Sequence, residues 1–115
     1  MTTLSTHVLD VYHGIPAANV SITVAQLVDG VWHVLNTVTT SDNGRCDEPV
    51  VRDAAIGTYE LLFHIGDYYK ARGVALPEPA FLQDIPVRFQ VAEQQSHYHV
   101  LLIVSPWNYQ VYRGS

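Results

Sequence analysis

The sequence predicts an all-β protein, an antiparallel β-sandwich of seven to eight strands with one short helix. Three observations favour this fold class. The strand-like segments are short, turn residues separate them at close spacing, and apolar and polar residues alternate inside several of them. Short strands with frequent turns are typical of sandwiches. We expect residues 1–115 to form a single domain, because a chain of 115 residues can bury one hydrophobic core.

Four strands are expected in the first part of the chain, because four segments are rich in β-branched and aromatic residues and are bounded by turn residues. They are residues 4–12, 20–28, 31–40 and 57–65. Asp29-Gly30 joins the second strand to the third, and this dipeptide readily adopts the positive φ angles of a type I′ turn. A further turn is expected at 41–45, which places Arg45 directly after Gly44.

One helix and two more strands are expected in the rest of the chain. Residues 66–73, GDYYKARG, form the helical segment, with Asp67 able to cap it and Gly73 able to end it. Residues 85–91 alternate between apolar and polar side chains, as a strand with one buried face does. The last strand begins at His97.

Composition and charge argue against several classes of protein. Hydrophobic residues make up 48% of the chain and charged residues 15%, which is typical of a globular protein. The net charge is -5 without a basic run, so nucleic acid is not an expected partner. There is no pattern of a membrane span or a signal peptide, so we expect no membrane association and a cytoplasmic location. The single cysteine, Cys46, cannot form an internal disulfide, which suits a reducing compartment.

The six histidines fall into two groups. His13 lies in an expected turn, and His33 and His64 alternate with apolar neighbours in strands, so we interpret these three as structural or solvated. His97 and His99 are two residues apart and therefore share one face of the last strand. The second group carries the candidate chemistry.

Two kinds of site are compatible with a pair of imidazoles. A metal site needs three or four ligands, and although Cys46 and His7 could complete one, no spacing pattern requires them. We therefore expect no metal. An acid–base site needs only an imidazole near its ordinary pKa of about 6.5 and a partner. Nucleophilic catalysis by serine or cysteine has little support, because there is no Gly-x-Ser-x-Gly motif and no matching basic motif for the cysteine.

Four segments together resemble one known family. They are LSTHVLD near the start, SDNGRCDEP in the middle, FLQDIPVRFQV, and HYHV followed by SPWNYQVYRGS at the end. The chain is similar over Leu4 to Ser115 to the 5-hydroxyisourate hydrolases, the transthyretin-like enzymes of urate degradation in purine metabolism, and Tyr-Arg-Gly-Ser is the signature of that family. The resemblance implies a prealbumin-like β-sandwich that assembles into a homotetramer, a dimer of dimers with active sites in the channel between the dimers.

The resemblance also implies roles for individual residues. His7, Arg45 and His99 match the catalytic residues of the family. The substrate-binding segment corresponds to Tyr112, Arg113, Gly114 and Ser115. His97 lines the channel mouth on this interpretation and is not catalytic. One departure is Leu101, where the family usually has proline, and it matters little because leucine fits a strand at least as well.

On the same interpretation, the first half of the last strand belongs to the active site and its second half belongs to the hydrophobic core. We expect His97 and His99 at the channel, with Leu101 and Ile103 deeper in packed protein. Regular pairing then stops at Ser105-Pro106, and the chain turns back to carry its polar end to the pocket.

The implied reaction is hydrolysis of the lactam ring of 5-hydroxyisourate to 2-oxo-4-hydroxy-4-carboxy-5-ureidoimidazoline. This reaction requires proton transfer to and from water, which histidines can perform, and stabilisation of negative charge, which an arginine can provide. It needs no metal or organic cofactor. The alternative is a small-molecule carrier of the thyroid-hormone type, because transthyretin shares the fold. The carrier has lysine, glutamate and threonine at the positions of His7, Arg45 and His99, so these residues favour the enzyme. The order of proton transfer and the group that Arg45 binds remain open.

Overall fold

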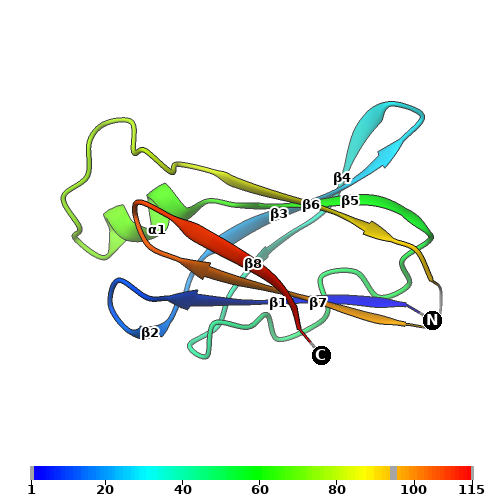
Figure 1. Cartoon of the computed structure of the whole chain (residues 1–115), viewed down its shortest axis with the longest axis horizontal. Helices are drawn as coiled ribbons and strands as arrows, with labels where there is room; N and C mark the ends of the chain where they lie inside the picture. Colours follow the sequence, from blue (N-terminus) through cyan, green and yellow to red (C-terminus); the bar gives the residue numbers. More distant parts are fainter. Residues whose placement is uncertain (1, 94–95, 115) are drawn as a thin grey trace.

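The computed structural model describes residues 2–93 and 96–114, and these form eight strands and one helix. The elements are β1 (Thr3–Asp10), β2 (Ile15–Pro16), β3 (Ser21–Val28), β4 (Val31–Thr39), β5 (Gly57–Phe63), α1 (Ile65–Ala71), β6 (Ile85–Val91), β7 (His97–Val104) and β8 (Tyr109–Gly114). Two four-stranded sheets, ordered β2-β1-β7-β8 and β4-β3-β5-β6, lie one above the other (Figure 1). The predicted all-β sandwich with one short helix is confirmed.

The core lies between the two sheets because one face of each strand is apolar. Along β1, Leu4 and Val8 are fully buried while the residues between buried positions are half-exposed. The second sheet contributes Ile22 of β3 with Leu61 and Phe63 of β5. This alternation leaves the other face of the first sheet, the one turned away from the core, available for a site.

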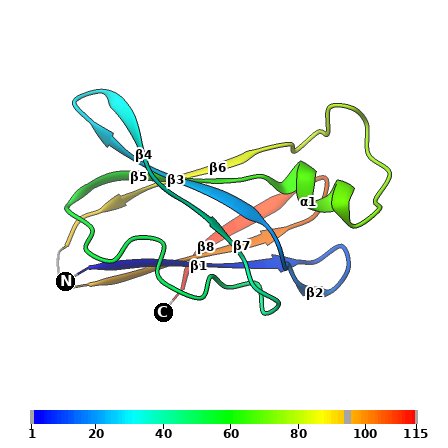
Figure 2. The same ribbon diagram turned by 180° about the vertical axis from the view of Figure 1, so that it is seen from behind.

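One strand pair differs from the prediction of a purely antiparallel sandwich. β1 and β7 are parallel, whereas the other strand pairs of the described residues are antiparallel. In this parallel register Ser5 lies opposite His99 and His7 lies opposite Leu101. Segments from the two ends of the sequence therefore run side by side in the middle of the first sheet (Figure 2).

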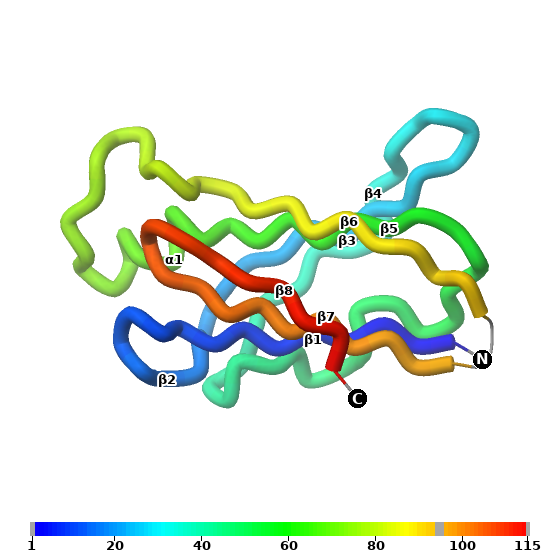
Figure 3. Tube along the Cα trace, viewed as in Figure 1, coloured from blue at the N-terminus to red at the C-terminus, as the bar shows by residue number. Residues whose placement is uncertain are grey.

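The two predicted turns are both present. Asp29 and Gly30 have φ angles of 51° and 78°, as a type I′ turn requires, and they join β3 to β4 in a hairpin that projects from the sandwich (Figure 3). In the second turn the N–H of Gly44 donates to the carbonyl of Ser41 at 2.9 Å. Gly44 has a φ of 80°, which favours glycine.

The helix is shifted slightly from its predicted range. It starts one residue earlier, so Ile65 belongs to α1 and not to the preceding strand. Asp67 is not the cap: it lies in the first turn, and its carboxylate accepts a hydrogen bond from Gln83 at 3.0 Å. Gly73 follows the end of the helix as expected, with a φ of 80°. Among the described residues there is no helix whose length and hydropathy would let it cross a membrane.

A buried carboxylate anchors the helix to the first sheet. Asp10, at the end of β1, is only 1% exposed and accepts hydrogen bonds from the hydroxyls of Tyr68 at 2.7 Å and Tyr69 at 2.8 Å. Nδ1 of His13 lies 2.6 Å from the same carboxylate. His64 bonds Thr23 and Asp84, and His33 is exposed, so these histidines have the structural or solvated positions that were predicted.

The burial of β7 differs from the prediction. Its core side is formed by residues 98, 100, 102 and 104, all of which are buried. Leu101 and Ile103 are half-exposed on the opposite, outer side, which they share with His97 and His99. The expectation that Leu101 and Ile103 continue into the core is therefore wrong for this chain, because strict alternation puts all four side chains on the outer face.

The last segment returns along β7 as predicted. Ser105 interrupts the pairing, and its hydroxyl accepts hydrogen bonds from the N–H groups of Trp107 and Asn108, both at 3.1 Å. β8 then pairs antiparallel with β7 and forms the edge of the sheet.

Candidate active site

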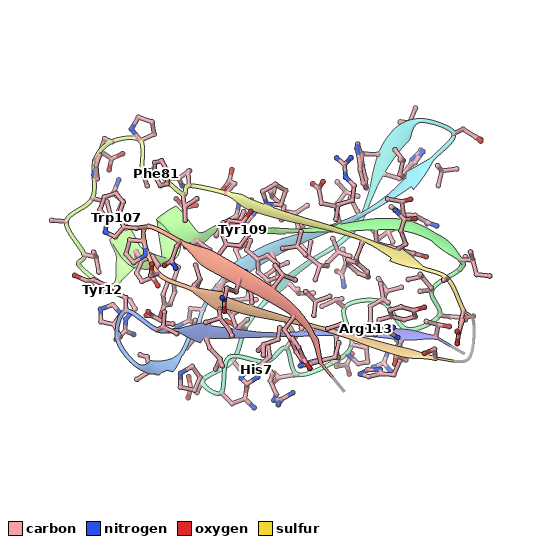
Figure 4. All side chains as sticks on the ribbon, viewed as in Figure 1. His7, Tyr12, Phe81, Trp107, Tyr109 and Arg113 are labelled. Carbon is pink, nitrogen blue, oxygen red and sulfur yellow. The ribbon has the colours of Figure 1, made fainter. Side chains whose placement is uncertain are left out.

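The outer face of β1 and β7 brings together five polar side chains, which we call the histidine face. They are Thr3, Ser5 and His7 from β1 and His97 and His99 from β7. Figure 4 shows His7 on the side of this sheet that points away from the second sheet. The cluster exists because the parallel register aligns odd-numbered residues of β1 with odd-numbered residues of β7.

The 41–45 turn places Arg45 beside His7. An isolated antiparallel bridge links the two residues, and the N–H of Val8 donates to the carbonyl of Gly44 at 2.9 Å. A Cβ atom on residue 44 would lie 2.5 Å from the carbonyl oxygen of Val8 and 3.1 Å from Cδ2 of His7. Only glycine therefore allows the turn to pack this closely against β1, and the Asn-Gly-Arg sequence puts an exposed guanidinium next to the imidazole.

A backbone carbonyl determines the tautomer of His7. Nε2 of His7 lies 2.9 Å from the carbonyl oxygen of Asn43. A carbonyl oxygen can only accept, so Nε2 carries the proton, and in neutral His7 the free lone pair is on Nδ1. Sequence reasoning missed the role of Asn43, because a contact made through its backbone leaves no signal in the type of side chain.

The two predicted catalytic histidines face each other without a direct hydrogen bond. Their ring centroids are 6.4 Å apart and the ring planes are inclined by 44°. At this separation one small substrate could contact both rings. The structure thus brings His7 and His99 together on one face of the sheet.

His99 is held in a line of hydrogen bonds along the strands. It is 8% exposed, and its Nδ1 lies 2.7 Å from the hydroxyl of Ser5. The same hydroxyl lies 3.0 Å from Nε2 of His97, and Nδ1 of His97 bonds the hydroxyl of Thr3. Because Nδ1 of His99 is engaged, Nε2 is its nitrogen available for chemistry. Sequence reasoning missed Ser5 and Thr3, although their alternation with His7 on β1 was a signal that could have found them.

Burial and neighbouring positive charge favour the neutral form of both histidines. Burial lowers the pKa of His99, and the charge of Arg45, followed by His7 and His97, lowers it further. Burial and then Arg45 also lower the pKa of His7, although its hydrogen bond to Asn43 acts in the opposite direction. Near neutral pH both rings are therefore uncharged and able to accept a proton.

The predicted substrate-binding segment divides between the two faces of β8. Gly114 lies opposite His99, and Tyr112, which is 65% exposed, lies opposite Leu101 on the outer face. Arg113 lies on the other face, with its guanidinium 4.2 Å from the centroid of the Tyr98 ring. The structure thus brings Gly114 to His99 but does not bring the side chain of Arg113 to the histidine face. Ser115 lies outside the described residues.

Metal ligation has no geometric support in the part of the chain that the structure describes. There, no three or more side chains of histidine, cysteine, aspartate or glutamate are grouped so that they could hold an ion. The side chains that this face offers for chemistry are three imidazoles, two of which favour the neutral form, one guanidinium and several hydroxyls.

Sequence comparison places the chain in a known group. The model of the HIUase/Transthyretin family matches residues 4–114. The chain is 48% identical over 117 residues to a 5-hydroxyisourate hydrolase of Ralstonia nicotianae, and the match covers 100% of both proteins. The chain belongs to the HIUase/Transthyretin family.

Solved structures share the fold. A crystal structure of (S)-allantoin synthase superposes with a TM-score of 0.92 at 34% identity, and the match covers 99% of this chain but 44% of that one. The structure of Klebsiella pneumoniae 5-hydroxyisourate hydrolase gives a TM-score of 0.84 at 27% identity, with 100% of both chains covered. Sea bream transthyretin in complex with thyroxine gives 0.87 at 26% identity, covering 97% of this chain and 94% of that chain. The fold is therefore common to enzymes and to a hormone-binding protein, and the site must distinguish them.

Proposed function

We propose that this chain is a 5-hydroxyisourate hydrolase, with His7, Arg45 and His99 as its catalytic residues. The observation that carries the proposal is the meeting of two neutral imidazoles, with ring centroids 6.4 Å apart, beside a guanidinium on the outer face of the first sheet. Identity of 48% to a hydrolase of that name supports it over the full length. Water attacks the lactam carbonyl, the carbon–nitrogen bond breaks, and the products are a carboxylate and a ureido group.

His7 is the general base in this scheme. Its Nε2–H is committed to the carbonyl of Asn43, so Nδ1 is the atom that can take a proton from the attacking water. The carbonyl of Asn43 also stabilises the imidazolium that forms, in the way that a hydrogen-bond acceptor behind a catalytic histidine generally does.

Arg45 and His99 act on the other charges of the reaction. Arg45 stabilises the negative charge that develops on the carbonyl oxygen, because its guanidinium carries a permanent charge and several donors. His99, through Nε2, protonates the departing ring nitrogen. Tyr112 and Gly114 border this site on β8, and their substrate-binding role, with that of Ser115, remains part of the proposal, whereas the side chain of Arg113 lies on the other face of the strand.

We also propose that four chains of 12.8 kDa form the homotetramer that the family resemblance implies. Large apolar side chains are exposed at one end of the sandwich, where Phe81 and Trp107 pack with ring centroids 6.2 Å apart, and exposed Tyr12 belongs to the same end (Figure 4). Exposed apolar patches of this kind mark interaction surfaces, and β8 is an edge strand that could pair with another copy. Sedimentation at micromolar concentration tests this proposal, and a monomer would argue against a site in a channel between subunits.

The decisive experiment generates 5-hydroxyisourate in situ by oxidising urate and follows its ultraviolet absorbance with and without the protein. We expect the protein to accelerate the decay. No acceleration, combined with tight binding of a thyroid-hormone-type ligand, would instead identify a carrier like the transthyretin that shares the fold.

A further inference from the structure

We propose that Ser5 and His97 form a proton relay that supplies a proton to His99 during turnover, so that both are positioning residues of the hydrolase. The proposal rests on the function proposed above. It assigns a task to one histidine that the sequence placed only at the channel mouth and to a serine that it did not consider.

The geometry of the relay is a continuous line of hydrogen bonds. It runs from Nδ1 of His99 to the hydroxyl of Ser5 at 2.7 Å, and from that hydroxyl to Nε2 of His97 at 3.0 Å. The His97 and His99 rings are nearly parallel, with an interplanar angle of 16° and centroids 6.4 Å apart, so Ser5 bridges two stacked rings. Thr3 bonds the remaining nitrogen of His97 and fixes the orientation of that ring.

Burial makes such a route useful. His99 is 8% exposed, and the neighbouring charge of Arg45 also disfavours its protonated form. A buried neutral imidazole that gave up its only proton would become an anion, which such a site cannot stabilise. His97 is exposed, so its ring is in contact with solvent, whereas His99 is buried.

The proton steps balance. As Nε2–H of His99 passes to the departing nitrogen, the proton of the Ser5 hydroxyl moves to Nδ1 of His99. At the same time Nε2–H of protonated His97 moves to the oxygen of Ser5. His97 ends neutral, Ser5 keeps one proton, and His99 is again neutral but carries its proton on Nδ1. After the product leaves, Nε2 of His99 takes up a proton from water in the site. The Nδ1 proton of His99 then returns to Ser5 and the proton of Ser5 returns to Nε2 of His97, which restores the starting state.

The direction of the relay predicts one tautomer. Before turnover the Ser5 hydroxyl donates to Nδ1 of His99, so neutral His99 carries its proton on Nε2. A hydroxyl has a single hydrogen, so Ser5 can donate to only one of its two histidine neighbours at a time. The tautomer of His99 therefore shows which way the hydrogen bonds from His97 through Ser5 to His99 are donated.

Variants can separate proton supply from hydrogen bonding. In Ser5→Ala both bonds are lost, whereas in His97→Gln the amide can still donate to Ser5 but cannot pass protons on. We expect kcat to fall about 10- to 100-fold in both variants, the usual scale for groups that orient a reactive histidine, with KM nearly unchanged. Ser5→Thr, which keeps a hydroxyl, should restore kcat. His33→Gln, which changes an exposed histidine of the other sheet, is the control.

A second measurement, which does not depend on activity, completes the test. Nitrogen-15 NMR of the wild type should show His99 protonated on Nε2 and a hydrogen-bonded Nδ1, and Ser5→Ala should remove that hydrogen-bond shift. Unchanged kcat in His97→Gln, or a His99 protonated on Nδ1 before turnover, would overturn the relay. If the wild type fails to hydrolyse 5-hydroxyisourate, the proposed function fails, and the NMR arm still decides whether Ser5 and His97 control the tautomer of His99.

Discussion

Gly114 lies directly opposite His99, and a Cβ atom on residue 114 would come within 2.6 Å of Cδ2 of the imidazole. No side chain larger than hydrogen fits there unless the ring moves. The ring cannot move freely, because Nδ1 is bonded to Ser5. The glycine of the last segment therefore fixes the orientation of the proposed proton donor.

Gly114→Ala should impair catalysis more than folding. The added methyl group pushes the His99 ring away from Ser5, and a displacement of about 1 Å in a catalytic group can cost about 10²-fold in rate. We expect kcat to fall on that scale with a small change in thermal midpoint, measured by the urate-coupled assay and by circular dichroism. Gln110→Ala, on the same strand and the same outer face but opposite Ile103, should keep near-native turnover. Equal rates for the two variants would refute the steric role of Gly114.

Single replacement of His7, Arg45 or His99 by alanine should reduce turnover by about 10²-fold or more, the usual scale for acid–base and charge-stabilising groups. The three variants should keep a native circular dichroism spectrum, because all three side chains lie on the outer face of the sheet or in the turn beside it. A variant with near-native turnover would remove that residue from the catalytic set.

Acid should destabilise the folded chain through His7 and His99. Their pKa values lie below the ordinary histidine value of 6.5, so between 6.5 and the lowered pKa values the unfolded chain binds protons that the folded chain does not. The free energy of unfolding should fall as pH decreases through that window, and these groups should have no effect above it. We expect the double variant His7→Gln/His99→Gln to show a weaker fall, measured by urea denaturation at several pH values. An identical pH dependence in the two proteins would show that other groups cause it.

Removal of residues 112–115 should abolish activity and also lower the thermal midpoint by a few degrees. A polar tail without ordered contacts could be lost without a change in stability. The structure instead places Tyr112–Gly114 in the β8 ladder and the Arg113 guanidinium over the ring of Tyr98, so the deletion removes hydrogen bonds and a cation–π contact. Differential scanning calorimetry of the truncated chain tests this, and an unchanged midpoint would show that the β8 edge contributes no stability.

Asp10→Ala should destabilise the protein without changing the chemistry of the site. Burial alone would raise the pKa of Asp10, but hydrogen bonds from His13, Tyr68 and Tyr69 outweigh burial and lower it. Loss of the carboxylate leaves the buried hydroxyls of Tyr68 and Tyr69 without their acceptor, at a cost of about 3 kcal/mol in the free energy of unfolding. Urea denaturation measures this cost. Tyr68→Phe, which removes one donor, should cost about 1 kcal/mol, and equal costs for the two variants would contradict the shared-acceptor arrangement.

Local sequence signals predicted the fold well where a single residue type decides the geometry. Asp29-Gly30 specifies its turn because both residues must adopt positive φ, and Gly73 follows the end of the helix for the same reason. The turn at 41–45, which carries Arg45 directly after Gly44, was also predictable. In contrast, the parallel pairing of β1 with β7 depends on how the chain crosses between the sheets, which no short segment encodes.

The site was predicted only in part, because several of its contacts run through backbone atoms or through long-range register. The approach of His7 to His99 followed from family resemblance and not from spacing. Asn43 acts through its carbonyl, and Ser5 becomes important only because the register sets it opposite His99. The sequence predicts burial of Leu101 because hydrophobic residues in strands usually face the core. Its odd-numbered position in β7 instead puts its side chain on the outer face.

The parallel pairing of β1 with β7 also has a consequence for biosynthesis. Ser5 and His99 are 94 residues apart, so the two halves of the site can meet only after the segment that contains His99 has left the ribosome. Until then β1 has only the two residues of β2 as a neighbour in its own sheet, and its other edge is unpaired. Closing so long a loop is entropically costly, so we expect folding of the nascent chain to be late and slow, with the first strand open to aggregation while synthesis continues.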